Sequence, residues 1–396
     1  MGQIVGIRGS GNIPAGMLRV DVASQLALLD VNRYPLLALL TNSGKDYLGN
    51  KIGGPIKKKA AINPKFTWWE DKYGEVWDAI NCVAGYEAGI TDIVVDNSAY
   101  FTKHDVVLVP RTAERMLVTN VATDTETLTV VRGIDGTGTA ALVDDDPLVI
   151  VGSASLEGSK ARDVNSTLAA EKFNYCQILK TTIGATETLK NTDIYTGEDL
   201  ATQRKKKGIE HMVAIERAFL FGKRAIITTG AHPQRFTGGI IERITTNVQD
   251  ESGSTLTEAE FETFLELLFT HGSASKYLFC SAKVLSAINL WARGKLQVVP
   301  TDKTYGISIN RYLSAHGEIN LIKHSLLEGA VYGGYAVGLD LETLTYRFLQ
   351  HRDTMLKTNI QDNDADEQKD QYISEVGLEV KQEERSAILK GVTGGE

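Results

Sequence analysis

Residues 196–222 read TGEDLATQRKKKGIEHMVAIERAFLFG, and this stretch predicts one long helix. Thr196 and Asp199 have the spacing of a near-capping box, and only Gly208 interrupts the helix-forming residues before Gly222. About 24 residues would form a rod of about 36 Å. The apolar residues expected on one stripe of this helix are Ile209, Met212, Val213, Phe219 and Leu220. A helix of this length is a main structural element, so the fold is not built from strands alone.

The basic run RKKK at 204–207 lies inside this helix. Adjacent positions on a helix point in different directions, so these side chains cannot all form one surface patch. We interpret the run as a solvated segment that faces neighbouring subunits. A phosphate-binding patch is the alternative.

An α/β pattern begins near residue 255, downstream of the long helix. Thr257 and Glu260 form a capping box, and Leu256 and Phe261 flank it as a hydrophobic staple. The elements expected after this first helix are a strand at KYLFC, a second helix (AKVLSAINLWA) capped by Ser281 and stopped by Gly294, and strands at 319–323 and 331–337.

Short β-branched runs dominate the chain before the long helix. TDIVV, DVVLVP, RMLVTNV, TLTVVRG and PLVIVG lie within residues 92–152 and are separated by DNS, TDTE and GTG. This pattern predicts an antiparallel meander. FNYCQILKTTI at 173–183 predicts a further strand pair, and two long strands are expected at 341–350 and 372–382, around the acidic loop 362–370.

The N-terminal stretch to about residue 62 mixes glycines with short apolar patches such as YPLLALL at 34–40, and ends in the basic run KKK at 57–59. It predicts an arm that needs something else to pack against. FTWWEDKY at 66–73 follows, and its tryptophans should anchor it to a surface. Trp68 and Trp69 are adjacent, so they cannot both be buried against one surface. One should pack on its own subunit, while the other faces a neighbour or solvent.

The glycine-rich stretch VVRGIDGTGTA at 130–140 raises the question of phosphate binding. A P-loop needs Gly-Lys-Ser/Thr, but Gly138 is followed by Thr139 and Ala140. The aspartates at 144–146 would repel a polyphosphate, and no helix pattern follows to receive the anion. The stretch therefore predicts the tip of a hairpin whose glycines have positive φ.

Other candidate sites also lack essential residues. GSGNIPAG at 9–16 has a misplaced third glycine and a proline where a dinucleotide-binding helix should begin. Asp362, Asp364 and Asp366 have the spacing of calcium ligands, but Glu367 and Ile373 replace the required glycine and glutamate. The histidines are scattered, and Cys82, Cys176 and Cys280 form no CxxC pair, as expected for a reducing cytoplasm. The sequence therefore predicts no catalytic, cofactor-binding or metal-binding residues.

Composition places further limits on function. The chain has 396 residues, which suggests two or three structural units, and its net charge of −8 argues against a dedicated nucleic-acid binder. A protein that merely encloses DNA would benefit from an acidic balance, because weak repulsion keeps its surface from gripping the polymer. No apolar run is long enough for a membrane span, and the N-terminus has no signal-peptide pattern.

Several stretches together resemble a known family. VLVPRTAERMLVTNV, LTVVRGIDGTGTAAL, LVIVGSASLEGS and FNYCQILKTTIGATETLKN resemble, in order, the central region of tailed-phage major capsid proteins of the SU10-like type. GIEHMVAIERAFLFGKR followed by FTGGI resembles their long helix and the loop after it, and DKTYGISINRYLSAHGEINLI is also in the expected order. The resemblance covers about residues 90–390, and the ordered set carries it rather than any one motif.

The resemblance implies an α+β fold of the Hong Kong phage 97 type. The expected parts are an N-terminal arm at 1–62, an extended loop at 63–190 with the β-meander inserted at about 92–152, a peripheral domain at 191–250 with its spine helix at about 197–222, an axial α/β domain at 251–339, and return strands of the peripheral domain at 340–396.

The implied function is structural rather than enzymatic. The chain would self-assemble through pentameric and hexameric capsomers into the icosahedral head of a tailed bacteriophage, inside the host cytoplasm, and become part of the virion capsid. It would enclose double-stranded DNA without sequence-specific contacts and without a membrane. Portal, scaffold and decoration proteins are the further expected partners. Two alternatives stay open: a tail-tube or baseplate subunit, which would not need the long helix or the α/β unit at 257–293, and a nucleotide-dependent enzyme, which would need an unorthodox loop.

Overall fold

The long helix expected after residue 196 is present in the computed structural model as α3 (Asp199–Phe221), whose 23 residues span about 35 Å. Thr196, the expected cap, lies outside the described residues, which are 34–41, 57–136, 138–192, 199–291, 296–297 and 309–395. Gly208 does not break the helix. A Cβ at this position would lie 3.2 Å from the Tyr372 hydroxyl oxygen, so glycine allows this tyrosine to pack closely against α3.

The buried face of α3 differs from the predicted stripe. The buried residues in its second half are His211, Ile215, Glu216, Phe219 and Leu220. Ile209, Met212 and Val213, which belong to the predicted stripe, are only partly buried. Met212 nevertheless packs against the core, so the prediction was wrong for Ile209 and Val213 only. It followed apolar side chains alone, whereas two polar side chains occupy part of the buried face.

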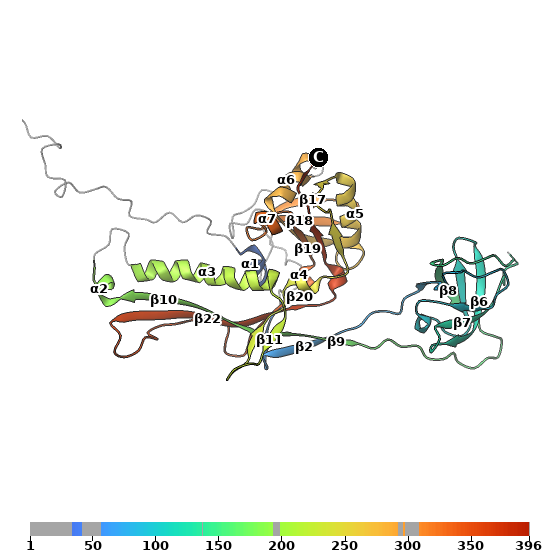
Figure 1. Cartoon of the computed structure of the whole chain (residues 1–396), viewed down its shortest axis with the longest axis horizontal. Coiled ribbons are helices and arrows are strands. Elements are labelled where there is room, and N and C mark those ends of the chain that lie inside the picture. Colours follow the sequence, from blue (N-terminus) through green and yellow to red (C-terminus); the bar gives the residue numbers. More distant parts are fainter. Residues whose placement is uncertain are drawn as a thin grey trace, which may run out of the picture. The chain divides into compact units, whose positions relative to one another are not determined.

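A five-stranded sheet packs against α3 (Figure 1). Its path in space is β1 (Lys57–Ala61), β20 (Leu344–Leu349), β22 (Glu367–Val380) and β10 (Gln177–Thr186), with β21 (Met355–Lys357) paired to β22. β1 is parallel to β20, and the other pairs are antiparallel. The pair β10–β22 extends from Gln177 opposite Val376 to Thr186 opposite Glu367, and it forms the surface on which the helix lies.

A second, seven-stranded sheet carries two helices, α5 (Glu258–Phe269) and α6 (Ala282–Trp291). Its strands in spatial order are β13 (Val248–Asp250), β23 (Ala387–Lys390), β19 (Ala336–Leu339), β15 (Ser275–Cys280), β18 (Glu318–Lys323), β17 (Ile309–Leu313) and β16 (Leu296–Gln297). Side chains from α5, α6 and these strands form one continuous apolar core.

Both helices of this region begin where the sequence predicts. The Thr257 hydroxyl accepts a hydrogen bond from the Glu260 N–H (3.3 Å), and the Glu260 carboxylate accepts one from the Thr257 N–H (2.8 Å). The Ser281 hydroxyl accepts a hydrogen bond from the Val284 N–H (3.2 Å) at the start of α6. Gly294, the expected end of α6, lies outside the described residues.

The sheets do not follow the expected boundaries at 251–339 and 340–396. Strands β13 and β23 lie outside the first range, yet they form one edge of the seven-stranded sheet. In addition, β24 (Gly394–Gly395) pairs with β14 (Thr255–Leu256). The predicted strand at 331–337 begins instead as the end of α7 (Gly329–Tyr332), and β19 starts at Ala336. Local sequence patterns do not reveal which distant strand will pair.

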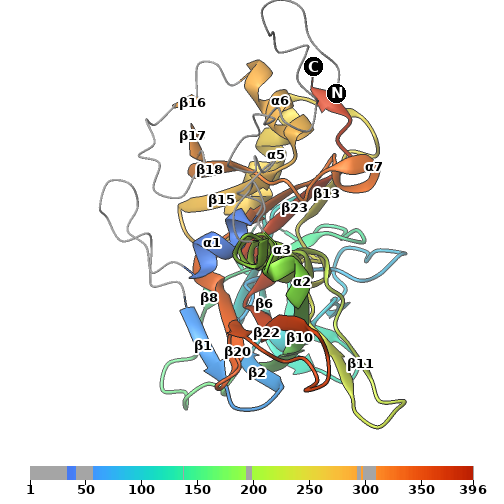
Figure 2. The same ribbon diagram turned by 90° about the vertical axis from the view of Figure 1, so that its left-hand side faces the viewer.

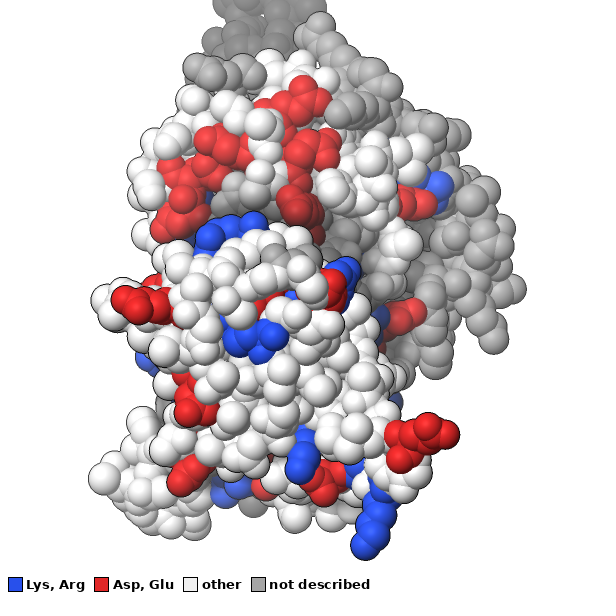
Figure 3. Space-filling view, turned by 90° about the vertical axis from the view of Figure 1, so that its right-hand side faces the viewer, with Lys and Arg blue, Asp and Glu red and all other residues white. Residues whose placement is uncertain are grey.

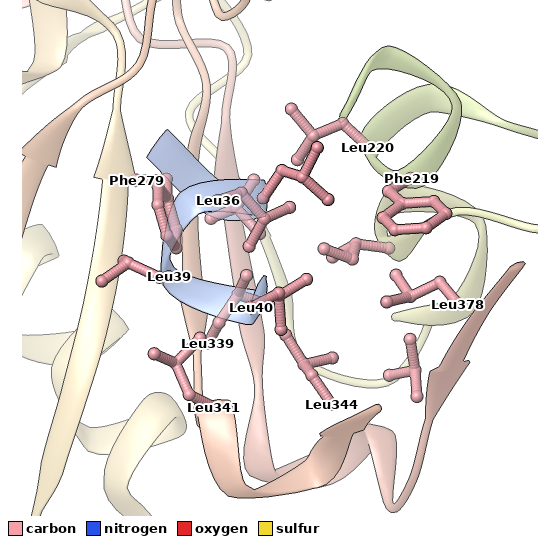
Figure 4. Close-up of a cluster of buried hydrophobic side chains, with 14 of the residues drawn as sticks. Leu36, Leu39, Leu40, Phe219, Leu220, Phe279, Leu339, Leu341, Leu344 and Leu378 are labelled. Carbon is pink, nitrogen blue, oxygen red and sulfur yellow. The ribbon is translucent and has the colours of Figure 1, made fainter. Parts of the chain in front are cut away.

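The apolar patch at 34–40 forms α1 (Pro35–Thr41), which lies beside α3 (Figure 2). Figure 4 shows its leucines among side chains of α3 and of both sheets. The labelled residues of this cluster are Leu36, Leu39, Leu40, Phe219, Leu220, Phe279, Leu339, Leu341, Leu344 and Leu378. The patch therefore packs within its own subunit. The rest of the expected arm before β1 lies outside the described residues, apart from Tyr34.

Shorter elements connect these layers. They are α2 (Glu187–Lys190), α4 (Ile240–Arg243), β11 (Ala225–Ile227), β12 (Gln234–Phe236), β2 (Lys65–Glu70), β9 (Ala170–Tyr175) and 3-10 turns at Ser98–Tyr100, Leu341–Thr343 and Glu383–Arg385. β2 pairs with β9, and β11 with β12. The predicted strand pair at 173–183 is wrong as a pair, because β9 and β10 belong to different sheets.

The chain divides into two compact units: unit 1 comprises residues 1–68 and 172–396, and unit 2 comprises 69–171. Unit 2 contains a six-stranded antiparallel sheet with the spatial order β3 (Trp77–Ala79), β8 (Pro147–Ser153), β5 (Asp105–Val109), β6 (Glu114–Ala122), β7 (Thr127–Val131) and β4 (Asp92–Val94). A bridge between Ile80 and Val95 joins the two ends, so the sheet closes around its own apolar core. Within the described ranges, no helix combines the length and apolar character needed to cross a lipid bilayer.

The meander prediction for 92–152 is confirmed only in part. β5, β6 and β7 are sequential neighbours, as in a meander, but β4 lies beside β7 and β8 lies beside β5. β3, at Trp77–Ala79, precedes the predicted range altogether. Closure of the sheet requires β3 and β4, the strands at the two ends of the spatial order, to meet. A local sequence pattern carries no information about that contact.

Candidate assembly surfaces

The glycine-rich loop at 132–140 is folded around an internal ion pair. The Glu114 carboxylate accepts hydrogen bonds from Nε and Nη2 of Arg132 (both 2.7 Å) and from the N–H groups of Gly133 and Ala140 (both 3.2 Å). Burial raises the pKa of Glu114, but these hydrogen bonds outweigh it and leave the pKa below its usual value. The Glu114 carboxylate of β6 thus occupies two N–H groups of the loop that a bound phosphate would require.

The glycines in this loop have the expected backbone conformation, with positive φ at Gly133 (+60°), Gly136 (+80°) and Gly138 (+78°). The loop is nevertheless not a hairpin tip, because it connects β7 to β8 and these strands are not neighbours in the sheet. The glycines with positive φ form turns within the connection that crosses from β7 to β8.

The aspartates that follow the loop also serve the fold of unit 2. Asp146 accepts hydrogen bonds from Nε (2.6 Å) and Nη2 (2.7 Å) of Arg111, and the Arg111 bond lowers the pKa of Asp146. Asp144 accepts a hydrogen bond from the Cys82 N–H (2.7 Å). These carboxylates fix neighbouring loops.

The outer face of unit 2 carries an apolar patch. Residues of β5 alternate between the core and the outside, so Val106 and Leu108 point away from the core. The patch, called here the outer patch, comprises Trp77, Val106, Leu108, Leu117, Val131 and Val149. Strands with apolar residues on both faces are typical of sheets that are covered on both sides.

Strand register makes the outer patch continuous. Val149 lies opposite both Trp77 and Leu108, and Leu117 lies opposite both Val106 and Val131. Trp77 is 58% exposed and Val131 is 48% exposed. The other four members are partly exposed. In the lower part of the face drawn in Figure 3, charged side chains are scattered among wider uncharged areas. Contiguous apolar surface that reaches solvent is typical of interaction sites.

The two adjacent tryptophans of β2 have opposite environments, as the sequence predicts. Trp68 is 7% exposed and packs with Ala61, Phe66 and Cys176, while Trp69 is 65% exposed. Further along the chain, Tyr73 is almost fully exposed as well. The first residues of unit 2 therefore present large aromatic side chains on the surface.

Charge is distributed unequally between the two units. Unit 2 contains 18 Asp and Glu against seven Lys and Arg, a net charge of −11. Because the whole chain carries −8, the remainder carries +3. Within the run 204–207, Arg204 pairs with Asp370 (2.6 Å) and Lys207 pairs with Glu210 (2.6 Å), whereas Lys205 and Lys206 are exposed. This division agrees with adjacent helix positions facing different ways.

Two buried histidines went unnoticed in the sequence. His211 contacts the hydroxyls of Thr181 (2.9 Å) and Ser374 (2.7 Å), and burial lowers its pKa. His324 is fully buried against Glu216. The only sequence signal for them was their position: His211 and Glu216 lie on the core-facing side of α3.

Within the part of the chain that the structure describes, no group of three His, Cys, Asp or Glu residues could hold a metal ion, and Asp362, Asp364 and Asp366 form no such group.

A comparison with protein families identifies the class. The sequence profile described as SU10 major capsid protein matches residues 8–393, nearly the whole chain. The protein is therefore a capsid protein of a tailed phage. Within that class, it belongs to the SU10 major capsid protein family.

Individual relatives are distant. The major capsid protein of Pseudomonas phage PaMx41 is 20% identical over 284 residues, which cover 68% of each chain. Among solved structures, the SrpI encapsulin complex of Synechococcus elongatus has a TM-score of 0.44 at 8% identity, covering 58% of this chain and 80% of that one. The structure from Mycobacterium phage Patience has a TM-score of 0.40 at 14% identity, covering 62% and 79%.

Family membership decides between the functions that the sequence left open. The protein is a structural subunit that assembles with its own copies into the shell of the phage head, and it resides in the virion capsid. It is neither a tail-tube or baseplate subunit nor a nucleotide-dependent enzyme.

Proposed function

We propose that unit 2 is the part of the subunit that contacts another copy of the same chain in the shell, through the outer patch. The continuity of this patch across β3, β8, β5, β6 and β7 is the observation that carries the proposal. A second copy of the chain fits as the occupant, because each subunit in the shell has other copies of the same chain as its neighbours. The charges also favour it: an acidic unit 2 is attracted to the remainder of the next chain, which is basic on balance.

The proposed organisation is that of the Hong Kong phage 97-type shell. Residues 1–62 act as the arm, 63–190 as the extended loop with unit 2 inserted, and α3 as the spine of the peripheral domain. The seven-stranded sheet with α5 and α6 acts as the axial domain. This axial domain includes β13 and β23, because both pair within that sheet.

The proposed partners follow from this role. Copies associate as pentameric and hexameric capsomers, and portal, scaffold and decoration proteins of the same phage complete the head. The shell encloses double-stranded DNA without reading its sequence, which agrees with an overall charge of −8.

The test places a charge in the outer patch. Val131→Lys should leave a folded, soluble subunit, because the side chain already reaches solvent, but it should sharply reduce the yield of closed shells. Thr123→Lys is the matched control: it makes the same change of charge at an exposed position in the connection between β6 and β7, outside the patch. Circular dichroism checks folding, and negative-stain electron microscopy counts shells. Wild-type shell yield from Val131→Lys would contradict the proposed contact.

A further inference from the structure

A buried carboxylate on α3 joins three separate parts of the chain. Glu216 is fully buried, and its Oε1 lies 2.5 Å from Nε2 of His324, which follows the end of β18. Nδ1 of His324 accepts a hydrogen bond from the Leu326 N–H (3.1 Å). Because Nδ1 is an acceptor, the ring proton is on Nε2, and His324 donates to Glu216.

The other partners of this carboxylate come from α1. The Leu36 N–H donates to Oε1 (3.0 Å) and the Leu37 N–H donates to Oε2 (3.2 Å). The first N–H groups of a helix have no acceptor within the helix, and Pro35 has no N–H to offer. Glu216 thus satisfies the two donors of the first turn that most need an acceptor inside a core.

The position of α1 gives this contact a structural consequence. Its leucines pack in one cluster with Phe219 of α3, Leu339 of the seven-stranded sheet and Leu344 of the five-stranded sheet. The Glu216–His324 hydrogen bond crosses the same junction, from α3 to the end of β18. The five-stranded and the seven-stranded sheets therefore meet around α1 and the Glu216–His324 pair.

We infer that Glu216 and His324 form a binding site for the first turn of α1. Bound α1 fixes the angle between the five-stranded and the seven-stranded sheets, and each copy enters the shell with this angle. The inference rests on the proposed assignment of these sheets to the peripheral and axial domains. Without α1, the buried Glu216 carboxylate would lose the Leu36 and Leu37 N–H donors and keep, among the described residues, that of His324, so docking of α1 and burial of the carboxylate are coupled. Small changes in this angle recur in every copy and alter the curvature of the shell.

The first experiment uses Glu216→Gln in the full-length chain. The amide keeps the shape of the carboxylate but directs an NH2 group at one of the three donors. We expect hydrogen exchange at the amides of Leu36, Leu37 and Leu40 to accelerate by about tenfold or more, while amides of α5 stay protected. Negative-stain images should show open or irregular shells. Glu210→Gln, on the exposed side of the same helix, is the control and should change neither readout.

A second variant guards against simple misfolding. Glu216→Leu combined with His324→Leu fills the site with apolar groups, and such a double replacement of a buried hydrogen-bonded pair is often nearly neutral for stability, yet it removes the carboxylate that accepts from α1. This folded variant should also release α1 and assemble irregularly. Unchanged exchange at α1 in both variants would overturn the binding site, and regular shells despite released α1 would overturn its role in assembly. Because the Val131→Lys test does not involve this site, failure of the proposed unit 2 contact would be seen separately.

Discussion

Lys276 is a fully buried lysine that holds the end of α5. Its Nζ donates to the carbonyl oxygens of Leu268 (2.5 Å), His271 (2.6 Å) and Arg385 (2.7 Å). Burial lowers the pKa of Lys276 to about 8, although the charge of Asp340 acts in the opposite direction. The ammonium group thus caps the C-terminal carbonyls of a helix at the cost of losing its hydration.

Lys276→Met should destabilise the protein by about 1–3 kcal/mol at pH 8, because the carbonyls of Leu268, His271 and Arg385 lose their shared donor. The pH dependence has a defined sign. Between the folded pKa of about 8 and the unfolded pKa of about 10.4, the unfolded chain binds more protons, so this group makes stability rise with pH. Urea unfolding of both proteins from pH 7 to 10 measures the difference. Lys283→Met, at an exposed position of α6, is the control. A parallel pH profile in wild type and Lys276→Met would refute the role of this ammonium.

At the scale of the element, β2 places two adjacent tryptophans in different roles. Trp68 is buried and stabilises the fold, while Trp69 is exposed and is expected to serve assembly. Trp68→Ala should lower the free energy of unfolding by about 3–5 kcal/mol, because it opens a cavity beside Phe66 and Cys176. Trp69→Ala removes an exposed ring and should leave stability almost unchanged while reducing shell yield, because an interface tryptophan typically contributes about 2–4 kcal/mol. Thermal melts and negative-stain images of both variants test this. Each variant is the control for the other, and equal effects on melting would contradict the division.

Local chemistry made several of these elements predictable. The capping box at Thr257 and the cap at Ser281 depend on residues within one turn, so short patterns were sufficient. The alternation of Trp68 and Trp69 follows from strand geometry alone. Sequence patterns failed where partners are distant: Leu36 and Glu216 are 180 residues apart, and the crossover from β7 to β8 depends on closure of the whole sheet.

The outer patch was predictable only in part from the sequence. Its strands appeared in the sequence as continuous β-branched runs, and such runs already indicate two covered faces. What the runs lacked was register, which decides that Trp77, Val149 and Leu108 share one face. Registers in a closed sheet are set by nonlocal pairing.

At the scale of the whole molecule, the charge division between unit 2 and the remainder predicts the response of assembly to salt. Attraction between −11 and +3 acts over distances that about 0.5 M NaCl screens. We expect the initial rate of shell formation, followed by light scattering, to fall by about tenfold between about 50 mM and 500 mM NaCl. Lys205→Glu with Lys206→Glu, both exposed on α3, should slow assembly at low salt and converge with wild type at high salt. Assembly that accelerates with salt would instead indicate that apolar burial alone drives association.

The pairing of β2 with β9 has a consequence for engineering. The chain leaves for unit 2 along one of these strands and returns along the other, so both ends of the insert begin at neighbouring points (Figure 1). Folded domains commonly have their termini close together, which is why insertion of one domain into another is tolerated. Exchanging residues 71–169 for a foreign domain with adjacent termini should therefore preserve the fold of unit 1, which becomes a carrier for the guest domain, whereas shell closure should be lost together with the outer patch.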